Sequence, residues 1–387
     1  MRVLRQSLGA FVMGLAAIVV RPRHALLAFA GFFIAATVLI ALLAIPRAID
    51  RAAAVTGSND VVLLIARTSN LAAGATLPAS DAGIAANLPG AVAAAPELIV
   101  TKTLRRTDGV ETDVLIRGVT SEAFAMTRPA LQILHGQRFK PGSNGIIVGR
   151  EAADAFPQLV QGGQVRFAKN LWRVSGQFAA GGSLWESEIW VPLATLQSAV
   201  NAQGKVSTVL VKLASPADFA RFKQAVKADP RLDVRLERQR EYYGRQVSFL
   251  VRFARIGVWG IAILLGLAAL AAIANAVGLG LVARGGELAV LRTLGFARAG
   301  LAVALIAEVL ITGLVGAGLA ALLCWQLLKG FNIVTSSTGH AIAIHLSVGP
   351  VLIGTAIGYA LVLGLVSALG PCLHAVMRPL ARGLREE

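Results

Sequence analysis

Long apolar stretches constrain this chain more than any other feature of its sequence. Residues 25–45 contain no charged side chain, and a helix of that length, rising about 1.5 Å per residue, crosses about 30 Å of hydrocarbon. Three more stretches of sufficient length lie at residues 248–283, which are apolar from residue 256 onward, and at residues 301–328 and 348–376. The sequence therefore predicts an α-helical membrane protein with four spans, one before and three after a long intervening segment.

The first of these stretches has an alternative interpretation as the core of a cleaved signal peptide. Such a core usually has about 7–15 residues, whereas residues 25–45 are longer and follow a further apolar stretch at residues 9–20. That shorter stretch cannot span a bilayer and is bracketed by arginines, which favours a helix lying along the membrane surface. We therefore expect an interfacial elbow helix within residues 1–24, followed by a first span.

Charged residues are concentrated in residues 46–247, between the first and second spans. This segment holds 24 of the 37 Lys and Arg and 17 of the 21 Asp and Glu. The whole chain is 56% hydrophobic and 15% charged, whereas a soluble domain has about 25% charged residues. The composition excludes a purely soluble protein and predicts a water-soluble domain inserted between membrane helices. The net charge of +16 lies largely beside apolar segments, where it orients helices, so nucleic-acid binding is not expected.

Basic residues in the short connecting segments indicate the orientation in the membrane. Residues 1–24, 284–300 and 377–387 each carry several arginines, whereas Lys329 is the only lysine or arginine in residues 329–347. Because positive residues remain on the cytoplasmic side, both termini and the 284–300 segment are predicted to be cytoplasmic. The inserted domain then lies in the periplasm, and the chain is expected in a bacterial inner membrane.

Strand and helix signals alternate in the inserted domain. Strand patterns occur at residues 61–66, 112–118, 145–148, 164–167, 172–178, 188–191 and 207–213, and helix signals at residues 80–88, 150–159, 192–200 and 216–229. The last helix has Ser215 in position to cap it and Pro216 at its first position. A charged stretch from residue 231 then runs without proline into the second span. The sequence predicts a mixed α/β domain with a stalk helix that continues through the membrane.

Sequence motifs for nucleotide and metal chemistry are absent. The chain has no G-x-x-x-x-G-K-[ST], no H-E-x-x-H and no C-x-x-C, so it lacks the usual phosphate loop, zinc-protease helix and dithiol pair. His340 and His345 are close in sequence but have no third ligand nearby, and ordinary interfacial histidines are the simpler interpretation. Cys324 and Cys372 lie in or beside apolar segments and cannot build a disulfide framework.

A hydrolytic site is the other chemistry to weigh. Ser183, Glu186 and Ser187 are close together, but no histidine lies near them in the sequence, and a serine nucleophile of the triad type needs one. No catalytic, cofactor-binding or metal-binding residue is predicted. The chain is therefore expected to be non-catalytic.

Two polar residues within the spans are more informative. Asn275 and Glu308 each lie about eight residues from the cytoplasmic end of their span, which places both about 12 Å deep. An acid at that depth usually marks function, and a proton relay is one interpretation. The other is a hydrogen bond from Asn275 to Glu308 that locks helix packing. Packing is favoured because Glu308 is expected to be a lone acid without a basic partner, which makes a poor proton relay.

The segment after the second span resembles the E-x-G-x-x-R-A-L-G signature of FtsX-like permeases, the family of macrolide exporters, lipoprotein-releasing complexes and the cell-division permease. It reads RGGELAVLRTLGF from residue 284 to residue 296. The matching positions are Glu287, Leu291, Arg292, Leu294 and Gly295. Ala289 stands where the family has a glycine.

Other parts of the chain extend this resemblance. Asn275 and Glu308 occupy positions typical of the family, and residues 148–153 and 188–197 look like its MacB-like periplasmic core domain. A looser match to the closing motif of the family involves Pro371, Ala375, Pro379, Leu384 and Arg385. The family layout of one span, a periplasmic domain and three spans agrees with the topology above, so the resemblance covers nearly the whole chain.

The resemblance implies the permease subunit of an ABC transporter that works as a dimer with two ATPase subunits. No ATPase is fused to this chain, so a separate subunit is expected to bind ATP and Mg, and no cofactor is expected here. The family implies export or extraction of a lipid, lipoprotein, peptide or drug, with membrane lipid and a periplasmic adaptor as further partners. The alternatives are a non-transporting signal transducer that regulates a periplasmic enzyme and a membrane sensor.

In such a permease the signature would form a short cytoplasmic coupling helix over residues 284–300. Its apolar side, formed by Val290, Leu291 and Leu294, would dock into a cleft of the ATPase, and its arginines would meet acidic groups at the rim. ATP-driven closure would then tilt the spans and move the stalk, which is mechanotransmission without passage of substrate across the bilayer. The expected ATPase-coupling residues are Arg284, Glu287, Val290, Leu291, Arg292, Leu294 and Gly295.

Overall fold

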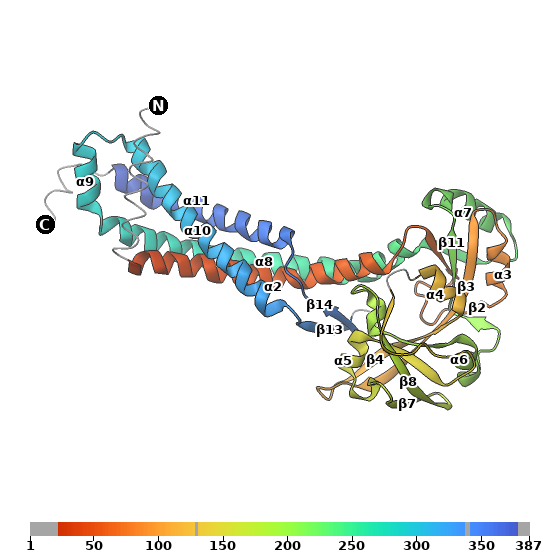
Figure 1. Ribbon diagram of the computed structural model, residues 1–387. Coiled ribbons are helices and arrows are strands. Elements are labelled where there is room, and N and C mark those ends of the chain that lie inside the picture. The colour runs from red at the N-terminus through yellow and green to blue at the C-terminus, as the bar shows by residue number, and fades with distance from the viewer. Residues whose placement is uncertain (1–21, 128–130, 337–340, 378–387) are drawn as a thin grey trace. The chain divides into compact units, whose positions relative to one another are not determined.

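The computed structural model describes residues 22–127, 131–336 and 341–377. The chain divides into two compact units (Figure 1). The first unit consists of Met1–Pro46, Phe253–Phe331 and Leu346–Glu387, and the second of Arg47–Arg252 and Asn332–His345. The predicted elbow helix falls mostly within residues 1–21, outside the described residues, as do His340 and the tail residues Pro379, Leu384 and Arg385.

Four helices in the described residues are long and apolar enough to cross a membrane. They are α2 (Pro22–Thr56), α8 (Gln239–Val282), α10 (Arg298–Leu328) and α11 (Pro350–Met377). A short helix, α9 (Gly285–Thr293), connects α8 to α10. The second, α/β unit follows the first long helix in the sequence, as predicted. The predicted fold class is confirmed: four long apolar helices with a mixed α/β domain between the first and second.

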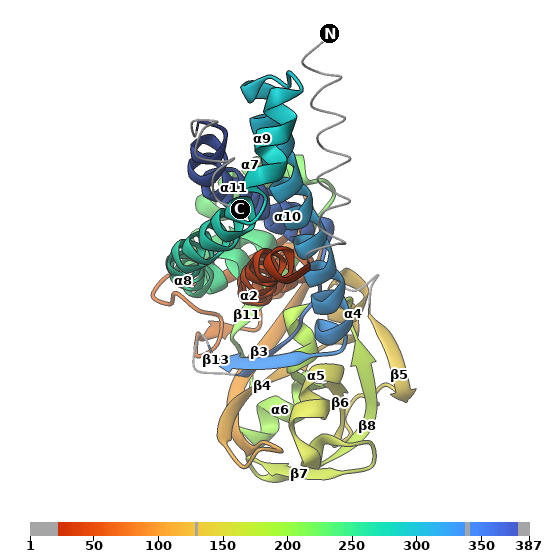
Figure 2. The same ribbon diagram turned by 90° about the vertical axis from the view of Figure 1, so that its left-hand side faces the viewer.

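Small residues allow the membrane helices to pack closely around α2, which lies between α8 and α10 (Figure 2). The Phe32 side chain of α2 is fully buried. A Cβ atom added at Gly313 or Gly316 of α10 would lie 3.1 or 3.0 Å from Phe32. These two glycines therefore serve packing within the chain. Among the described residues, nothing lies within 4 Å of a Cβ placed at Gly354 or Gly358, so this pair does not pack within the chain.

The second unit is built on a ten-stranded sheet with the strand order β12-β1-β11-β3-β4-β9-β6-β8-β5, and β7 pairs with β8 outside this path. Its strands are β1 (Val61–Ala66), β3 (Ala91–Arg105), β4 (Glu111–Val119), β5 (Gln132–Gly136), β6 (Gly145–Gly149), β7 (Gln164–Phe167), β8 (Asn170–Ala179), β9 (Ile189–Pro192), β11 (Thr208–Leu213) and β12 (Val234–Arg238). The β4–β9 and β6–β8 pairs are parallel, and the other pairs are antiparallel. The sheet is therefore mixed.

Short helices and two small ribbons complete this unit. The helices are α3 (Asp81–Ala86), α4 (Ser121–Thr127), α5 (Arg150–Ala155), α6 (Leu193–Ala199) and α7 (Phe219–Ala228), and the 3₁₀ turns are η1 (Pro157–Leu159), η2 (Leu184–Ser187) and η3 (Pro216–Asp218). The ribbons pair β2 (Leu77–Pro78) with β10 (Lys205–Val206), and β13 (Asn332–Ser336) with β14 (Ala341–His345). The β13–β14 ribbon is the connection between α10 and α11.

The start of the stalk differs from the prediction. Residues 231–238 were expected to be helical, but the chain forms β12 there, and α8 begins only at Gln239. The reason is non-local, because β12 pairs with β1 in antiparallel register, from Val62 opposite Arg238 to Ala66 opposite Val234. Edge pairing with a buried strand outweighs the helical tendency of a charged stretch.

Candidate functional site

The coupling helix α9 ends at a glycine that the backbone requires. Gly295 has φ of +91°, a conformation that side chains with a Cβ adopt at a cost. The amide of Leu294 donates to the Val290 carbonyl at 3.0 Å, and that of Gly295 donates to the Arg292 carbonyl at 3.1 Å. The Leu-Gly pair of the signature is therefore a helix stop. It sets where the chain turns into α10.

The apolar residues of α9 divide between its two faces. Leu288 and Ala289 are buried, Leu288 lies in the apolar cluster of the membrane helices, and Leu291 packs partly against that cluster. Val290 and Leu294 face outward, with 51% and 71% of their surface exposed. Of the three predicted docking residues, Val290 and Leu294 are thus presented to a partner, whereas Leu291 also holds α9 in place.

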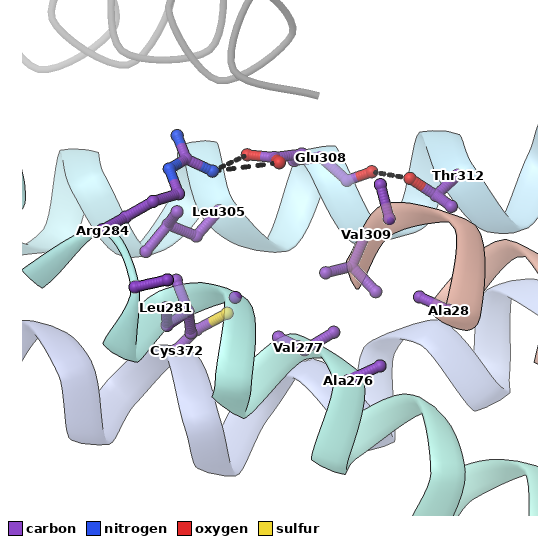
Figure 3. A pocket seen from close by; sticks show the side chains of 13 residues that line it. Ala28, Ala276, Val277, Leu281, Arg284, Leu305, Glu308, Val309, Thr312 and Cys372 are labelled. Atoms are coloured by element: carbon purple, nitrogen blue, oxygen red, sulfur yellow. Dashed lines mark hydrogen bonds and ion pairs between the residues drawn. The ribbon is translucent and has the colours of Figure 1, made fainter. Parts of the chain in front are cut away.

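Arg284 links α9 to the third membrane helix. Its Nη1 atom lies 3.1 Å from each carboxylate oxygen of Glu308 in α10, and its Nε atom lies 3.6 Å from Oε2 of Glu287 in α9. Figure 3 shows the Arg284 and Glu308 side chains meeting beside a pocket, with Thr312 donating its hydroxyl to the Glu308 carbonyl at 2.9 Å. Three of the predicted site residues therefore form one ionic cluster.

The predicted hydrogen bond between Asn275 and Glu308 is wrong for the described residues. Asn275 is exposed on α8, and Glu308 pairs with Arg284 instead. The expectation that Glu308 lacks a basic partner fails because Arg284 follows the end of α8, and α9 returns the chain beside that end. A charge-assisted bond to a guanidinium is also stronger than one to an amide.

A small cavity of about 80 Å³ lies between α2, α8, α10 and α11 (Figure 3). Most of its wall is apolar, including Ala28, Leu281 and Val309. The Arg284–Glu308 pair provides its charged wall, and Cys372 of α11 also reaches it. The ionic cluster therefore borders free space inside the helix bundle, which leaves it room to rearrange.

In the second unit, the η2 turn contacts three elements that are continuous in sequence with the membrane helices. The Leu184 amide donates to Oγ1 of Thr56, at the end of α2, at 2.7 Å. The Trp185 indole donates to the Tyr243 hydroxyl, in the first turns of α8, at 3.1 Å. Strand β14, which leads to α11, also packs against η2. We call Leu184–Ser187 with these three attachments the η2 junction.

Glu186 stabilises the η2 junction from inside. Its side chain is fully buried, and its Oε1 accepts hydrogen bonds from the amides of Ala180 and Gly182, both at 2.7 Å. Its Oε2 accepts one from Nη2 of Arg150 at 2.8 Å. Ser183 is buried too, and its hydroxyl has no hydrogen-bond partner among the described residues. Glu186 is thus committed to backbone structure, and the described residues show no hydrogen bond that would activate Ser183.

A buried ionic network lies next to the η2 junction. Arg117 of β4 donates from Nη1 to Glu97 at 2.7 Å and from Nε and Nη2 to the two oxygens of Glu188, both at 2.6 Å. The Trp190 indole donates to Glu188 at 2.9 Å. Burial disfavours the Arg117 charge, but the Glu188 and Glu97 carboxylates raise the pKa of Arg117 well above its ordinary value. Such a network resists single changes, because a lost partner leaves a buried charge unpaired.

Comparison with protein families decides the identity of the chain. Residues 25–229 match the MacB-like periplasmic core domain, and residues 259–380 match the FtsX-like permease C-terminal region. The chain belongs to the FtsX/MacB-like permease family. It is a multi-pass transmembrane permease of the ABC-transporter type with an extracellular MacB-like domain.

Two of the solved structures similar to this permease are an extracellular domain and a periplasmic region. The extracellular domain of the noncanonic ABC-type transporter YknZ from Gram-positive bacteria is 18% identical, with a TM-score of 0.34, and the match covers 42% of this chain and 88% of that chain. The periplasmic region of MacB from Actinobacillus actinomycetemcomitans is 12% identical, with a TM-score of 0.36, and the match covers 48% and 91%. A search of curated proteins finds no match.

Sequence reasoning predicted one part of this candidate site and missed the other. The signature residues from Arg284 to Gly295 lie on one short helix and its ends. The η2 junction was missed because its attachments connect residues far apart in the sequence, as with Thr56 and Leu184. A signal was present at residues 184–191, where Glu186 and Glu188 lie among leucine, tryptophan, isoleucine and valine.

Proposed function

We propose that this permease is the non-catalytic membrane subunit of an ABC machine and transmits ATP-driven movement from a separate ATPase to its extracellular domain. The observation that carries the proposal is the construction of α9. Val290 and Leu294 are exposed on a helix that is held to α10 through Arg284 and Glu308. An ATPase that binds these side chains would pull on the third membrane helix through an ionic link. ATP and Mg would be held by that partner chain.

The length of α8 supports mechanical transmission. It is one continuous helix of 44 residues, which corresponds to about 66 Å at 1.5 Å per residue. That is about twice the thickness of the hydrocarbon core, so part of the helix must extend beyond the membrane. A continuous helix transmits displacement, and Tyr243 near its start is bonded to the η2 junction.

We also propose that a second copy of the permease covers α8. In the most apolar 18-residue stretch of this helix, 22% of the residues are buried. The corresponding share is 39% in each of the other three long helices. Asn275 is exposed on the same helix, and an amide facing lipid is unfavourable, whereas polar side chains bond between membrane helices. A cysteine replacing Asn275 should form a disulfide between copies on oxidation, and one replacing Val303, exposed on α10, should not. The reverse result would place the contact elsewhere.

The Lys and Arg distribution supports cytoplasmic termini, an outward-facing α/β domain and a bacterial inner membrane as the location. Within this frame the proposed cargo is a lipid, lipoprotein, peptide or drug that is exported or extracted on the outer side, with a periplasmic adaptor as an added partner. The non-transporting signal transducer is the second candidate. The same transmission path supports it, because a moving extracellular domain could regulate an enzyme instead of a cargo.

Copurification with the ATPase tests the proposal. Replacing both Val290 and Leu294 by Asp puts two charges on the proposed docking face, and burying an unpaired charge costs several kcal/mol. The yield of copurified ATPase should fall at least tenfold while the permease remains folded. Val110→Asp is the matched control, since Val110 is equally exposed in the second unit. Wild-type yield from the double variant would contradict docking on α9.

A further inference from the structure

The ribbon between α10 and α11 ends in a histidine that touches a buried acid. Nε2 of His345, the last residue of β14, lies 2.9 Å from Oε1 of Glu151 in α5. Strand β14 packs against α5, η2 and β4. The contact therefore fastens the β13–β14 ribbon to the side of the η2 junction formed by α5.

One acid at this contact, Glu151, is short of hydrogen-bond donors. Glu151 and Glu186 are both buried, with 3% and 0% of their surface exposed. Arg150 donates to Glu186 at 2.8 Å, but its Nε is 3.5 Å from Glu151. Apart from these approaches by Arg150 and His345, neither carboxylate oxygen of Glu151 has a hydrogen-bond partner among the described residues. Two buried carboxylates thus face one guanidinium, which is unfavourable unless a proton is present.

The electrostatics of both groups favour one proton at this contact. Burial raises the pKa of Glu151 to about 7, Arg150 opposes this increase, and Glu186 and Asp154 add to it. Burial and the nearby Arg150 lower the pKa of His345, while Glu186 and Asp154 work in the opposite direction. A single proton placed on either group gives a neutral acid donating to imidazole or an imidazolium donating to carboxylate. Either form places a proton between two atoms that lie 2.9 Å apart.

Strand β4 is the remaining element that packs against β14, and its charged residues either have partners already or lie at the start of the strand. Its Arg117 is bonded to Glu97 and Glu188. Asp113 accepts a hydrogen bond from Thr103 at 2.6 Å, and Glu111 pairs in register with Arg105 at the start of the strand. The shared proton therefore depends on α5, η2 and β14.

We propose that one proton shared by Glu151 and His345 fastens the β13–β14 ribbon to the extracellular domain, and that loss of this proton releases the ribbon. The ribbon leads directly into α11, so its attachment adds a third link between this domain and the membrane helices, besides α2 and α8. External pH then sets how tightly the domain follows movement of the last two spans.

The direction of each pKa change determines whether docking of the ribbon strengthens or weakens as the pH rises. The pKa of Glu151 is raised in the docked state, so its contribution is present at low pH and is lost as pH rises through about 7. The pKa of His345 is lowered, so its contribution is lost as pH falls below about 6.5 and opposes that of Glu151 there. Above that pH only the Glu151 contribution changes. Docking should therefore weaken as the pH rises from 6 to 8.5.

Hydrogen exchange of the full-length permease in lipid nanodiscs tests this latch. Peptides that cover residues 150–156 and 341–346 report the two faces of the contact. After correction for the intrinsic pH dependence of amide exchange, protection in both should fall roughly threefold or more between pH 6 and pH 8.5, within the limit of about tenfold per pH unit for one proton. Unchanged protection in both peptides would overturn the proposal.

Conservative variants separate the shared proton from simple packing. Glu151→Gln keeps a neutral donor of the same shape, so both peptides should stay protected at pH 8.5 and lose the pH response. His345→Gln can still accept a hydrogen bond from protonated Glu151 but does not titrate, so the loss of protection above pH 6.5 should remain and the opposing effect below it should disappear. The matched control is His135→Gln, at an exposed histidine of β5, which should behave as wild type. A wild-type pH response in Glu151→Gln would overturn the latch.

Discussion

Nη1 of Arg284 lies 3.1 Å from both carboxylate oxygens of Glu308, so a residue at the start of the coupling segment is tied to one in the third membrane helix. The same arginine approaches Glu287 of α9. Displacement of α9 by a partner therefore reaches α10 directly through one guanidinium. In a partly buried site this pair has few alternative partners, and breaking it leaves a charge unpaired.

Reversal of the Arg284–Glu308 pair should show whether this link matters. Arg284→Glu alone brings two acids together and should lower the unfolding temperature and abolish stimulation of the partner ATPase. Glu308→Arg alone should do the same by placing two cations together. The Arg284→Glu/Glu308→Arg double variant should recover part of both properties, with a coupling energy of about 1–3 kcal/mol. Additive losses in a double-mutant cycle, measured by thermal unfolding and ATPase assay, would exclude a direct interaction.

The helix stop of α9 gives a prediction at one backbone position. Gly295→Ala forces a Cβ into a residue with φ of +91°, at a cost of about 1–2 kcal/mol. The end of α9 should loosen, and stimulation of the ATPase should fall several-fold although no docking side chain changes. Gly285→Ala is the matched control, because a Cβ at Gly285 has free space around it and its φ is ordinary. Equal activity of the two variants would show that the stop at Gly295 is dispensable.

Most of the fold prediction rested on the hydropathy of the sequence and on residues that begin or end helices and strands. The four long helices follow from runs of apolar residues, and β-branched runs gave strands such as β1 (Val61–Ala66) and β7 (Gln164–Phe167) at the predicted residues. The Ser215 cap is confirmed, because its side chain accepts a hydrogen bond from the Ala217 amide. These features are local, so the sequence alone specifies them.

Long-range pairing produced the features that sequence reasoning missed. The first part of strand β3 contains an alanine run and Pro96 and has little strand tendency of its own, yet β3 is a central strand held by β11 and β4. Asn275 and Glu308 were paired by equal depth alone, but helix rotation turns Asn275 outward. The attachment of Thr56 to Leu184 joins residues 128 positions apart. Depth and periodicity do not determine such contacts.

Cysteine labelling tests the predicted topology with positions chosen from the structure. Both native cysteines are buried, so the wild-type background should react slowly. A cysteine at Val110, 54% exposed in the second unit, should react with a membrane-impermeant maleimide added to spheroplasts. One at Gly286, exposed on α9, should react only after the membrane is permeabilised. Labelling at position 286 alone in intact spheroplasts would invert the orientation.

The last prediction concerns the hydrogen bond between Thr56 and Leu184 at the η2 junction. The Thr56 hydroxyl accepts from the Leu184 amide at 2.7 Å and donates to the Ala52 carbonyl at 2.6 Å, and Thr56 is buried. Thr56→Val preserves the shape but leaves the buried amide unsatisfied, at a cost of about 1–3 kcal/mol. Thr56→Ser keeps both hydrogen bonds and is the matched control. If α2 transmits movement through this bond, the valine variant should retain ATPase copurification but lose stimulated transport or signalling, whereas the serine variant should retain both. Full activity of the valine variant, with the expected fall in thermal stability, would limit Thr56 to a structural role and leave α8 and the β13–β14 ribbon to carry the movement.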